Sequence, residues 1–188
     1  MRVIGGSERG RRLQVPKGRE VRPTPDRVRE TLFNWLQGEV EGTAALDLFA
    51  GSGALGIEAL SRGAAVATFA ENARPALAAL EANLASLTDS GRSEVVRVPV
   101  WRYLKQAPAR SYHLVFLDPP YGRGWAARAA HRLETGGWLA PGAAIYVETG
   151  ADESAPEVPA TWGQRREGRC GEVAYRLFRN EAPTEETP

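Results

Sequence analysis

A tetrapeptide suited to act on a planar amine, Asp118-Pro119-Pro120-Tyr121, directly follows an apolar run at residues 114–117. The lone pair of a planar amine is delocalised into a ring or carbonyl, so the amine is a weak nucleophile until acceptors hold both of its hydrogens. The carboxylate of Asp118 and a nearby backbone carbonyl are such acceptors, and the ring of Tyr121 can stack on the ring that carries the amine. Taken alone, the tetrapeptide also fits a rigid loop after a buried strand, because two prolines fix φ and cannot donate to a β-ladder.

A glycine-rich segment about seventy residues earlier favours the chemical interpretation. Residues 51–56 fit the pattern G-x-G-x-x-G, and Glu71 lies about 20 residues beyond Gly51, as in a dinucleotide-binding fingerprint. However, Asp47 precedes the first glycine, where a carboxylate would repel a pyrophosphate but attract the ammonium group of a methionine moiety. The segment therefore predicts S-adenosylmethionine and methyl transfer, while Glu71 can accept ribose hydroxyls in either cofactor class. A nicotinamide-dependent oxidoreductase is disfavoured by Asp47 and by the lack of a substrate domain.

Apolar runs and helical patterns alternate along the chain and predict an α/β fold. The expected strands are 44–47, 66–70, 94–98, 113–118, 143–148 and an antiparallel pair at 162–169 and 172–179, and the expected helices are 54–62, 73–87 and 125–134. Such alternation gives a mostly parallel sheet with helices on both faces and with ligands outside the carboxyl ends of its strands. Asp47, Glu71 and Asp118 all lie at such ends.

The first 35 residues are basic, with nine Arg or Lys against four acids, a local net charge of +5. Residues 1–20 read as a short β-hairpin, which must pack on the main domain or on a partner because a lone hairpin is marginal in water. We expect this segment to contact RNA phosphates through Arg9, Arg11, Arg12 and Arg22, although a solvated basic face would have the same composition.

A helix is expected to start at Thr24-Pro25-Asp26, with the Thr24 hydroxyl as its cap. Val28, Leu32, Trp35 and Leu36 then share one face. The predicted organisation is a hairpin at 1–20, a main domain at 21–180 and a disordered acidic tail at 181–188.

Composition limits the remaining possibilities. With 188 residues, 43% hydrophobic and 25% charged, the chain fits one globular domain. No apolar stretch reaches the roughly 18 residues of a membrane span, and the first residues lack the apolar region of a signal peptide, so we expect a cytoplasmic protein. We also expect a monomer. One cysteine and two scattered histidines predict no metal site.

Four motifs, in this order, resemble the bacterial 16S ribosomal RNA guanine-N2 methyltransferases of the RsmD type. They are Arg2-Val3-Ile4-Gly5-Gly6, the segment Arg22-Pro23-Thr24-Pro25-Asp26-Arg27-Val28-Arg29-Glu30, the segment from Leu46 to Gly56, and Asp118-Pro119-Pro120-Tyr121. The resemblance covers about residues 1–150. The last motif alone would be shared with adenine-N6, cytosine-N4 and glutamine-N5 methyltransferases.

The resemblance implies a class I, Rossmann-like methyltransferase fold with a seven-stranded sheet and S-adenosyl-L-methionine as cofactor. It implies a guanine of the 16S rRNA as target, of the guanine-966 type, in the small ribosomal subunit or a late assembly intermediate. The catalytic residues would be Asp118, Pro119, Pro120 and Tyr121. The cofactor-binding residues would be Thr24, Asp47, Phe49, Ala50, Gly51, Ser52, Gly53, Glu71, Asn72 and Val100.

One departure from the family pattern concerns the adenine of the cofactor. Where the family usually has Gly-Asp-Ala after the third strand, this chain reads Val98-Pro99-Val100-Trp101. No carboxylate replaces the usual one, so recognition of the adenine there must rest on backbone groups or weaken. This departure leaves open a catalytically weak RNA-binding assembly factor on the same fold. A second alternative keeps the chemistry and methylates another planar amine, such as adenine N6 in RNA or DNA, although a separate recognition domain would not fit in 188 residues.

Overall fold

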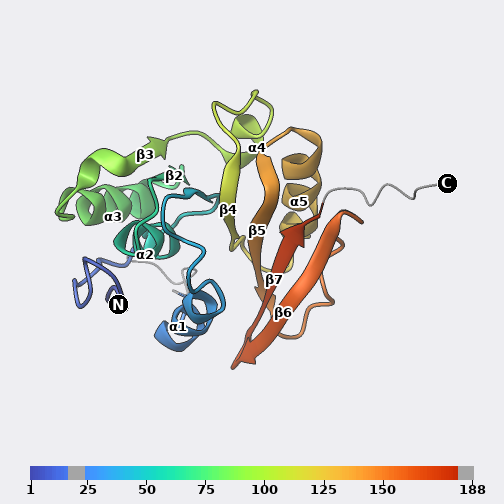
Figure 1. The fold of residues 1–188 in the computed structure, drawn as a ribbon, viewed down its shortest axis with the longest axis horizontal. Coiled ribbons are helices and arrows are strands. Elements are labelled where there is room, and N and C mark those ends of the chain that lie inside the picture. The colour runs from blue at the N-terminus through green and yellow to red at the C-terminus, as the bar shows by residue number, and fades with distance from the viewer. Residues whose placement is uncertain (17–23, 182–188) are drawn as a thin grey trace.

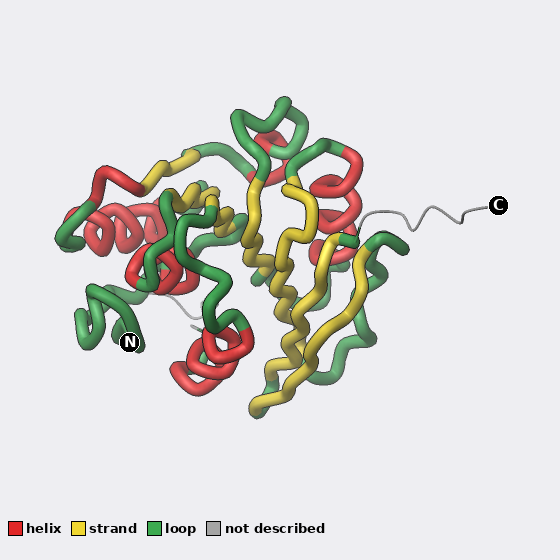
Figure 2. The backbone as a smooth tube through the Cα atoms, viewed as in Figure 1, coloured by secondary structure: helices red, strands yellow, loops and turns green. Residues whose placement is uncertain are grey.

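The computed structural model describes residues 1–16 and 24–181 (Figures 1 and 2). The helices are α1 (Asp26–Trp35), α2 (Ala54–Ser61), α3 (Arg74–Ala85), α4 (Val100–Tyr103) and α5 (Trp125–Thr135), with a 3₁₀ turn at Ser90–Arg92. The strands are β1 (Ala44–Asp47), β2 (Val66–Ala70), β3 (Ser93–Val96), β4 (Tyr112–Leu117), β5 (Leu139–Gly150), β6 (Trp162–Cys170) and β7 (Val173–Asn180). Within these ranges, no helix combines the length and the apolar character needed to cross a membrane.

The strands of the described ranges form one seven-stranded sheet in the order β3-β2-β1-β4-β5-β7-β6. The pairs from β3 to β5 are parallel, whereas β7 pairs antiparallel with both β5 and β6. Parallel neighbours return to the same end of a sheet, so β1, β2, β4 and β5 end at one edge, here called the carboxyl edge. The predicted mostly parallel sheet is confirmed.

Hydrophobic clusters cover both faces of the sheet because side chains alternate along each strand. Ala45, Phe69 and Phe116 pack with α1, α2 and α3, whereas Leu46 and Val115 pack with α4 and α5. The predicted two-sided arrangement is therefore present, and Figure 1 shows these helices around the central strands. α2 is buried along its whole length, which explains its almost entirely apolar sequence.

The start of α1 differs from the prediction. Pro25 is the N-cap residue and no side chain caps the helix, so the expected capping role of Thr24 is wrong. The Thr24 hydroxyl lies instead within hydrogen-bond distance of Asp118 and Glu148 at the carboxyl edge. An ionised carboxylate is a stronger acceptor for a hydroxyl than a neutral group, and these two acids lie after β4 and within β5, far away in the sequence.

Other element bounds also change. The sequence did not predict α4, which starts after Pro99, a residue whose fixed φ suits a helix start. β5 begins at Leu139 instead of 143, because Tyr112 pairs with Leu139 before a register shift in the ladder. α3 ends at Ala85, and Leu87 is buried beyond that end.

Residues 1–16, here called the arm, form a reduced version of the expected hairpin. They contain one isolated bridge, between Arg2 and Arg12, and no strand. Val3 and Leu13 are buried in the cluster shared by α1, α2 and α3, so the arm packs on the main domain. Residues 17–20 of the predicted hairpin and residues 182–188 of the predicted tail lie outside the described residues.

Candidate active site

Acidic side chains gather at the carboxyl edge, as the sequence predicted. Asp47 ends β1, Glu71 follows β2, and Asp118 follows β4. The structure adds Glu148, near the end of β5, which the sequence analysis missed. The signal was present, because Glu148 closes the apolar run 143–148 in the way that the other three acids close theirs. In residues 1–16 and 24–181, no group of three or more His, Cys, Asp or Glu side chains could hold a metal ion.

The glycine loop after β1 leaves its backbone accessible. Gly51 has φ +55°, and a Cβ placed there would meet no heavy atom within 4 Å. Gly53 has φ +80°, and a Cβ there would lie 2.5 Å from Leu80 Cδ1. The first glycine therefore gives a ligand close access to the backbone, and the second allows α3 to pack against the loop. These features fit a nucleoside cofactor.

Glu71 fixes the glycine loop from the neighbouring strand. Its Oε2 accepts a hydrogen bond from the Gly51 N–H at 2.9 Å, and its Oε1 accepts bonds from Asn72 and Ala73, each at 2.7 Å. Oε1 already accepts two hydrogen bonds, whereas Oε2 accepts one and retains capacity for a further donor. The predicted contact with ribose hydroxyls is compatible with this geometry.

Asp47 is buried, and its Oδ2 accepts a hydrogen bond from the Gly56 N–H in the first turn of α2 at 3.0 Å. Burial, with a contribution from the charge of Glu71, raises the pKa of Asp47 to about 7, although the Gly56 bond opposes the shift. A cationic group bound beside Asp47 would favour its charged form. The environment therefore suits the ammonium group that the sequence analysis assigned to this position.

Asp118 and Glu148 meet across the hydroxyl of Thr24. The Oγ1 atom of Thr24 lies 3.3 Å from Asp118 Oδ2 and 3.3 Å from Glu148 Oε2. Glu148 also accepts hydrogen bonds from the phenols of Tyr121 and Tyr146, each at 2.7 Å. Thr24 thus lies beside the predicted catalytic residues, and its contact with the cofactor stays a prediction.

Like charges and burial determine the protonation of these acids. Burial, together with the charges of Glu148 and Asp47, raises the pKa of Asp118 well above its ordinary value, while the Thr24 hydroxyl opposes the shift. Burial also raises the pKa of Glu148, against its three hydroxyl donors. Burial and the charge of Glu148 raise the pKa of Tyr121, so its phenol remains a donor. Asp118 and Glu148 therefore hold a proton more readily than isolated carboxyl groups do.

Tyr121 presents its ring to solvent beside these acids. It is 36% exposed and is the one exposed large hydrophobic side chain among the residues that the structure describes. Pro120 before it is exposed, whereas Pro119 is buried. The ring is therefore accessible while its phenol is held by Glu148, which suits a stacking platform.

An aromatic group lies beside the predicted adenine position, and the sequence analysis missed it. The ring centroid of Phe49 lies 6.0 Å from that of Trp125 and 6.2 Å from that of Trp101. The guanidinium carbon of Arg128 lies 4.1 Å from the Trp101 centroid. Val100 is buried in the cluster that contains Ala70, so this position offers apolar surface in place of the family's usual acid.

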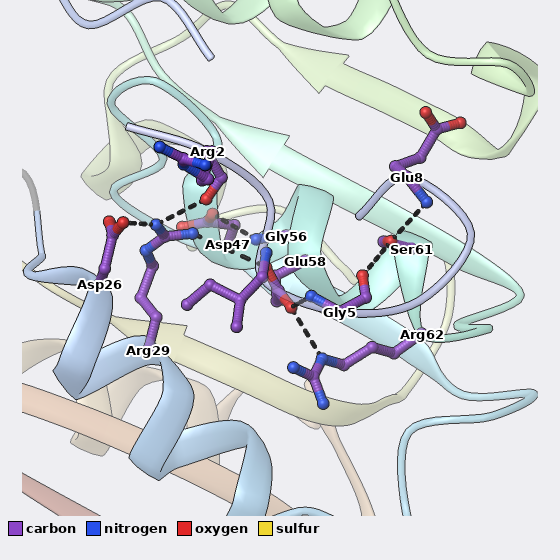
Figure 3. Close-up of polar contacts among 11 residues, drawn as sticks. Arg2, Gly5, Glu8, Asp26, Arg29, Asp47, Gly56, Glu58, Ser61 and Arg62 are labelled. Atoms are coloured by element: carbon purple, nitrogen blue, oxygen red, sulfur yellow. Dashed lines mark hydrogen bonds and ion pairs between the residues drawn. The ribbon is translucent and has the colours of Figure 1, made fainter. Parts of the chain in front are cut away.

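The arm is held on the domain by polar contacts of Glu8, Arg11, Arg29, Glu58 and Arg62, here called the arm seam. Figure 3 shows these residues other than Arg11. The Glu58 carboxylate accepts hydrogen bonds from the backbone N–H groups of residues 4 and 5 and from Arg62, each at 2.8 Å. The fully buried Arg29 donates to the carbonyl of Arg2 at 2.8 Å. The sequence analysis identified neither Glu58 nor Arg29 as a buried charge.

The predicted RNA-binding arginines differ in their surroundings. Arg9 and Arg12 are exposed. Arg11 instead bonds to Glu8, to the carbonyl of Ser86 and to Thr88. Arg22 lies outside the described residues. Arg9 and Arg12 therefore keep the strongest case for phosphate contact.

Asn83 connects the arm to the glycine loop. Its Oδ1 accepts a hydrogen bond from the Gln14 N–H at 2.7 Å, and its Nδ2 donates to the carbonyls of Gln14 and Ser52 at 3.0 and 2.9 Å. Asn83 is 1% exposed, so these bonds are shielded from water.

Comparisons with known proteins agree with this geometry. A ribosomal RNA small subunit methyltransferase D from Escherichia coli (strain K12) is 48% identical over 185 residues, which cover 98% of this chain and 92% of that protein. The structure of a putative methyltransferase yhhF from Escherichia coli has a TM-score of 0.88 at 47% identity and covers 96% of this chain and 98% of that chain. An RNA methyltransferase from Salinibacter ruber, solved in complex with S-adenosyl-L-homocysteine, shares the fold with a TM-score of 0.64 at 16% identity, over 89% of this chain and 97% of that chain.

The seven-stranded sheet and the arrangement of its carboxyl edge are those of a class I methyltransferase fold, as the sequence predicted. A family model described as "Conserved hypothetical protein 95" matches residues 1–179. The chain belongs to this family, which is that of the RsmD-type proteins, and the resemblance seen in the sequence is confirmed.

Proposed function

We propose that the chain is an S-adenosyl-L-methionine-dependent rRNA methyltransferase that modifies N2 of a guanine in the 16S rRNA of the small ribosomal subunit. The observation that carries this proposal is the position of Asp118 and the half-exposed Tyr121 beside the glycine loop at one edge of the sheet. The names of the relatives support the rRNA target. The guanine N2 specificity, at a site of the guanine-966 type, rests on the resemblance of the motifs.

The cofactor-binding residues each have a defined task. Asp47 attracts the ammonium group of the methionine moiety, and Glu71 accepts the ribose hydroxyls. The backbone at Gly51 allows close approach, and Phe49 and Val100 supply apolar surface for the adenine. When bound, S-adenosyl-L-methionine supplies a methyl group on a positively charged sulfur.

The target base is held by the residues after β4. Asp118 accepts one hydrogen of the exocyclic amine, and the carbonyl of Pro119 accepts the other, so the lone pair of nitrogen becomes available. The guanine leaves its stack to enter the site, and Tyr121 stacks on it. Positioning of the amine supplies much of the rate. Asp118 receives the proton that the amine releases on methylation.

The arm approaches the RNA backbone in this proposal. Arg9 and Arg12 contact phosphates, while the arm seam holds the arm in place on the domain. The substrate is the small subunit or a late assembly intermediate, and the protein acts as a monomer.

The test uses the purified full chain and small ribosomal subunits from a strain that lacks the corresponding gene. With deuterated methyl donor, nucleoside mass spectrometry is expected to find labelled N2-methylguanosine, and primer extension to map it to one position. Naked 16S rRNA, tested in parallel, distinguishes the assembled particle from free RNA as substrate. Label in N6-methyladenosine would contradict the proposal, as would binding of the cofactor without any label in either substrate.

A further inference from the structure

The Thr24 hydroxyl has two carboxyl groups within the same distance and only one hydrogen to donate. Its Oγ1 lies 3.3 Å from both Asp118 Oδ2 and Glu148 Oε2. Thr24 is 6% exposed and Glu148 is 2% exposed, so water has little access to these two groups, whereas Asp118 is half-buried. If both carboxyl groups were ionised, one would face a lone pair of the hydroxyl oxygen. A single added proton satisfies all three groups, because Thr24 then donates to one carboxyl and accepts from the other.

The groups around this pair are acids and phenols. Asp47 faces Asp118 from the end of β1, and the phenols of Tyr121 and Tyr146 donate to Glu148. Glu153 acts on Tyr121 from the loop after β5. Like charge and burial therefore favour retention of one proton by the pair, in keeping with the raised pKa values of Asp118 and Glu148.

From this geometry we infer that Asp118 and Glu148 share one proton through the hydroxyl of Thr24, and that Glu148 holds it when the target amine enters. Asp118 is then ionised and accepts the amine hydrogen. The inference rests on the proposed function only for the identity of the amine. Thr24 and Glu148 are positioning residues, since they act on the substrate through Asp118.

The proton transfer is balanced within the three side chains. Asp118 gives its proton to Thr24 Oγ1, Thr24 gives its own hydrogen to Glu148 Oε2, and each electron pair stays on the oxygen that released the proton. Asp118 gains the negative charge that Glu148 loses. When the amine has been methylated, it gives one proton to Asp118, and the pair returns one proton to water after the product leaves.

Opposite changes in the ionisation of Asp118 are expected from two substitutions. Glu148→Gln places an amide donor beside Thr24 at every pH, so Thr24 donates to Asp118 and favours its charged form. The acid limb of the pH profile of kcat/KM should move to lower pH by about one unit. Thr24→Val removes the hydroxyl and should move the limb to higher pH, and Thr24→Ser should restore it. A purely structural role would lower activity without opposite shifts.

The experiment measures the pH profiles of kcat/KM on small ribosomal subunits. Independently of activity, ¹³C NMR of carboxyl-labelled aspartate follows the titration of Asp118, whose signal is assigned with Asp118→Asn. The control is Glu157→Gln, because Glu157 is an exposed acid in the loop between β5 and β6; it should shift neither readout. Thermal melting confirms that each variant is folded. If Glu148→Gln proves unfolded, the comparison of Thr24→Val with Thr24→Ser still tests the inference.

Opposite shifts of the Asp118 titration in the two variants support the inference, even if the wild type proves inactive on guanine. In that case the proposed function fails and the proton sharing stands. Coincident titrations of wild type, Glu148→Gln and Thr24→Val, or shifts of the Thr24→Val titration to lower pH, would overturn it.

Discussion

The arm seam and the carboxyl edge both bury acidic side chains, but their surroundings are opposite. At the seam, Glu58 faces two backbone N–H groups and the guanidinium groups of Arg29 and Arg62. Burial acts to raise the pKa of Glu8, but bonds from Thr88 and Arg11 outweigh it and lower that pKa.

At the carboxyl edge, Asp47, Asp118 and Glu148 face one another, and the pKa of each is raised. Burying a charge without a partner destabilises a fold. Removing the partner of a paired buried charge destabilises it for the same reason. The comparison teaches that the seam acids are paired with donors and cations, while the edge acids are buried beside like charges; under the proposed function, the edge acids serve ligand binding at the expense of stability. Substitutions at the two places should therefore separate stability from activity.

The largest effect is expected from Glu58→Ala. It removes the acceptor of Arg62 and of two backbone N–H groups, and the charge that faces Arg29 at 3.7 Å, so the free energy of unfolding should fall by about 3–5 kcal/mol. Chemical denaturation measures this loss. Glu157→Ala, at an exposed acid, is the control and should change it by less than about 0.5 kcal/mol. Equal stability of the two variants would contradict the structural role of Glu58.

Asp118→Ala should lower activity without lowering stability, the opposite of Glu58→Ala. The rate of methylation should fall about 10²–10³-fold because an acceptor for the reacting amine is lost, while cofactor affinity stays within a few-fold. At a pH high enough to ionise Asp118, the variant should be at least as stable as the wild type, since a charge beside Glu148 and Asp47 has been removed. Single-turnover assays, calorimetry and denaturation provide the three measurements. A loss of cofactor binding in proportion to activity would place Asp118 in the cofactor site instead.

Substitutions on the exposed face of the arm should change binding to the RNA without changing stability. Reversal of Arg9 and Arg12 to Glu should weaken binding to small subunits by about tenfold for each lost phosphate contact at 0.1 M salt, and flatten the salt dependence by about one unit per contact. Filter binding across a salt series tests this. Melting should be unchanged, whereas Arg11→Glu should lower the melting temperature because Arg11 belongs to the seam. If the double variant keeps its affinity and salt slope, the RNA approaches another face.

Asp47→Asn should weaken cofactor binding by about 2 kcal/mol, the scale of a hydrogen bond to a charged group. Because the pKa of Asp47 is about 7, wild-type affinity should fall as the pH drops from 8 to 6, and the variant should lose this dependence. The folded-state pKa lies above the ordinary 3.8, so the stability that Asp47 contributes is present at low pH and lost as the pH rises through 7. The variant should thus gain stability over the wild type at pH 8 but not at pH 4. Calorimetry and denaturation at these pH values are the measurements.

The smallest effect is expected at Tyr121. Tyr121→Ala should weaken substrate engagement by about 1–2 kcal/mol if stacking dominates. Tyr121→Phe keeps the ring but loses the bond to Glu148, and it should retain most of the affinity. An equal rise of KM in both variants would assign the effect to the phenol and remove the ring from the platform role.

The sequence alone was sufficient to predict a site residue where that residue lies at the end of a strand. Asp47, Glu71 and Asp118 follow apolar runs, and parallel strands bring such ends to one edge. Glu148 follows the same pattern and was predictable, but no motif drew attention to it.

The remaining contacts depend on packing between distant segments. Thr24 reaches a carboxyl 94 residues away and another 124 residues away, so its local context indicated only a helix cap. Arg29 lies on the buried side of α1, where helical periodicity would place an apolar residue. Its burial requires Glu58 of α2 and the carbonyl of Arg2, and no local pattern specifies that meeting.

The side-chain amide of Asn83 has a consequence for the rigidity of the glycine loop. Both of its hydrogens are taken, one by the carbonyl of Gln14 and one by that of Ser52. Neither carbonyl can move away without leaving a buried donor empty, at a cost on the order of 1–3 kcal/mol. The amide group of Asn83 thus links the glycine loop to Gln14 in the arm. Because Gln14 belongs to the arm, removal of the arm would take away one acceptor of Asn83, and the glycine loop should become more mobile.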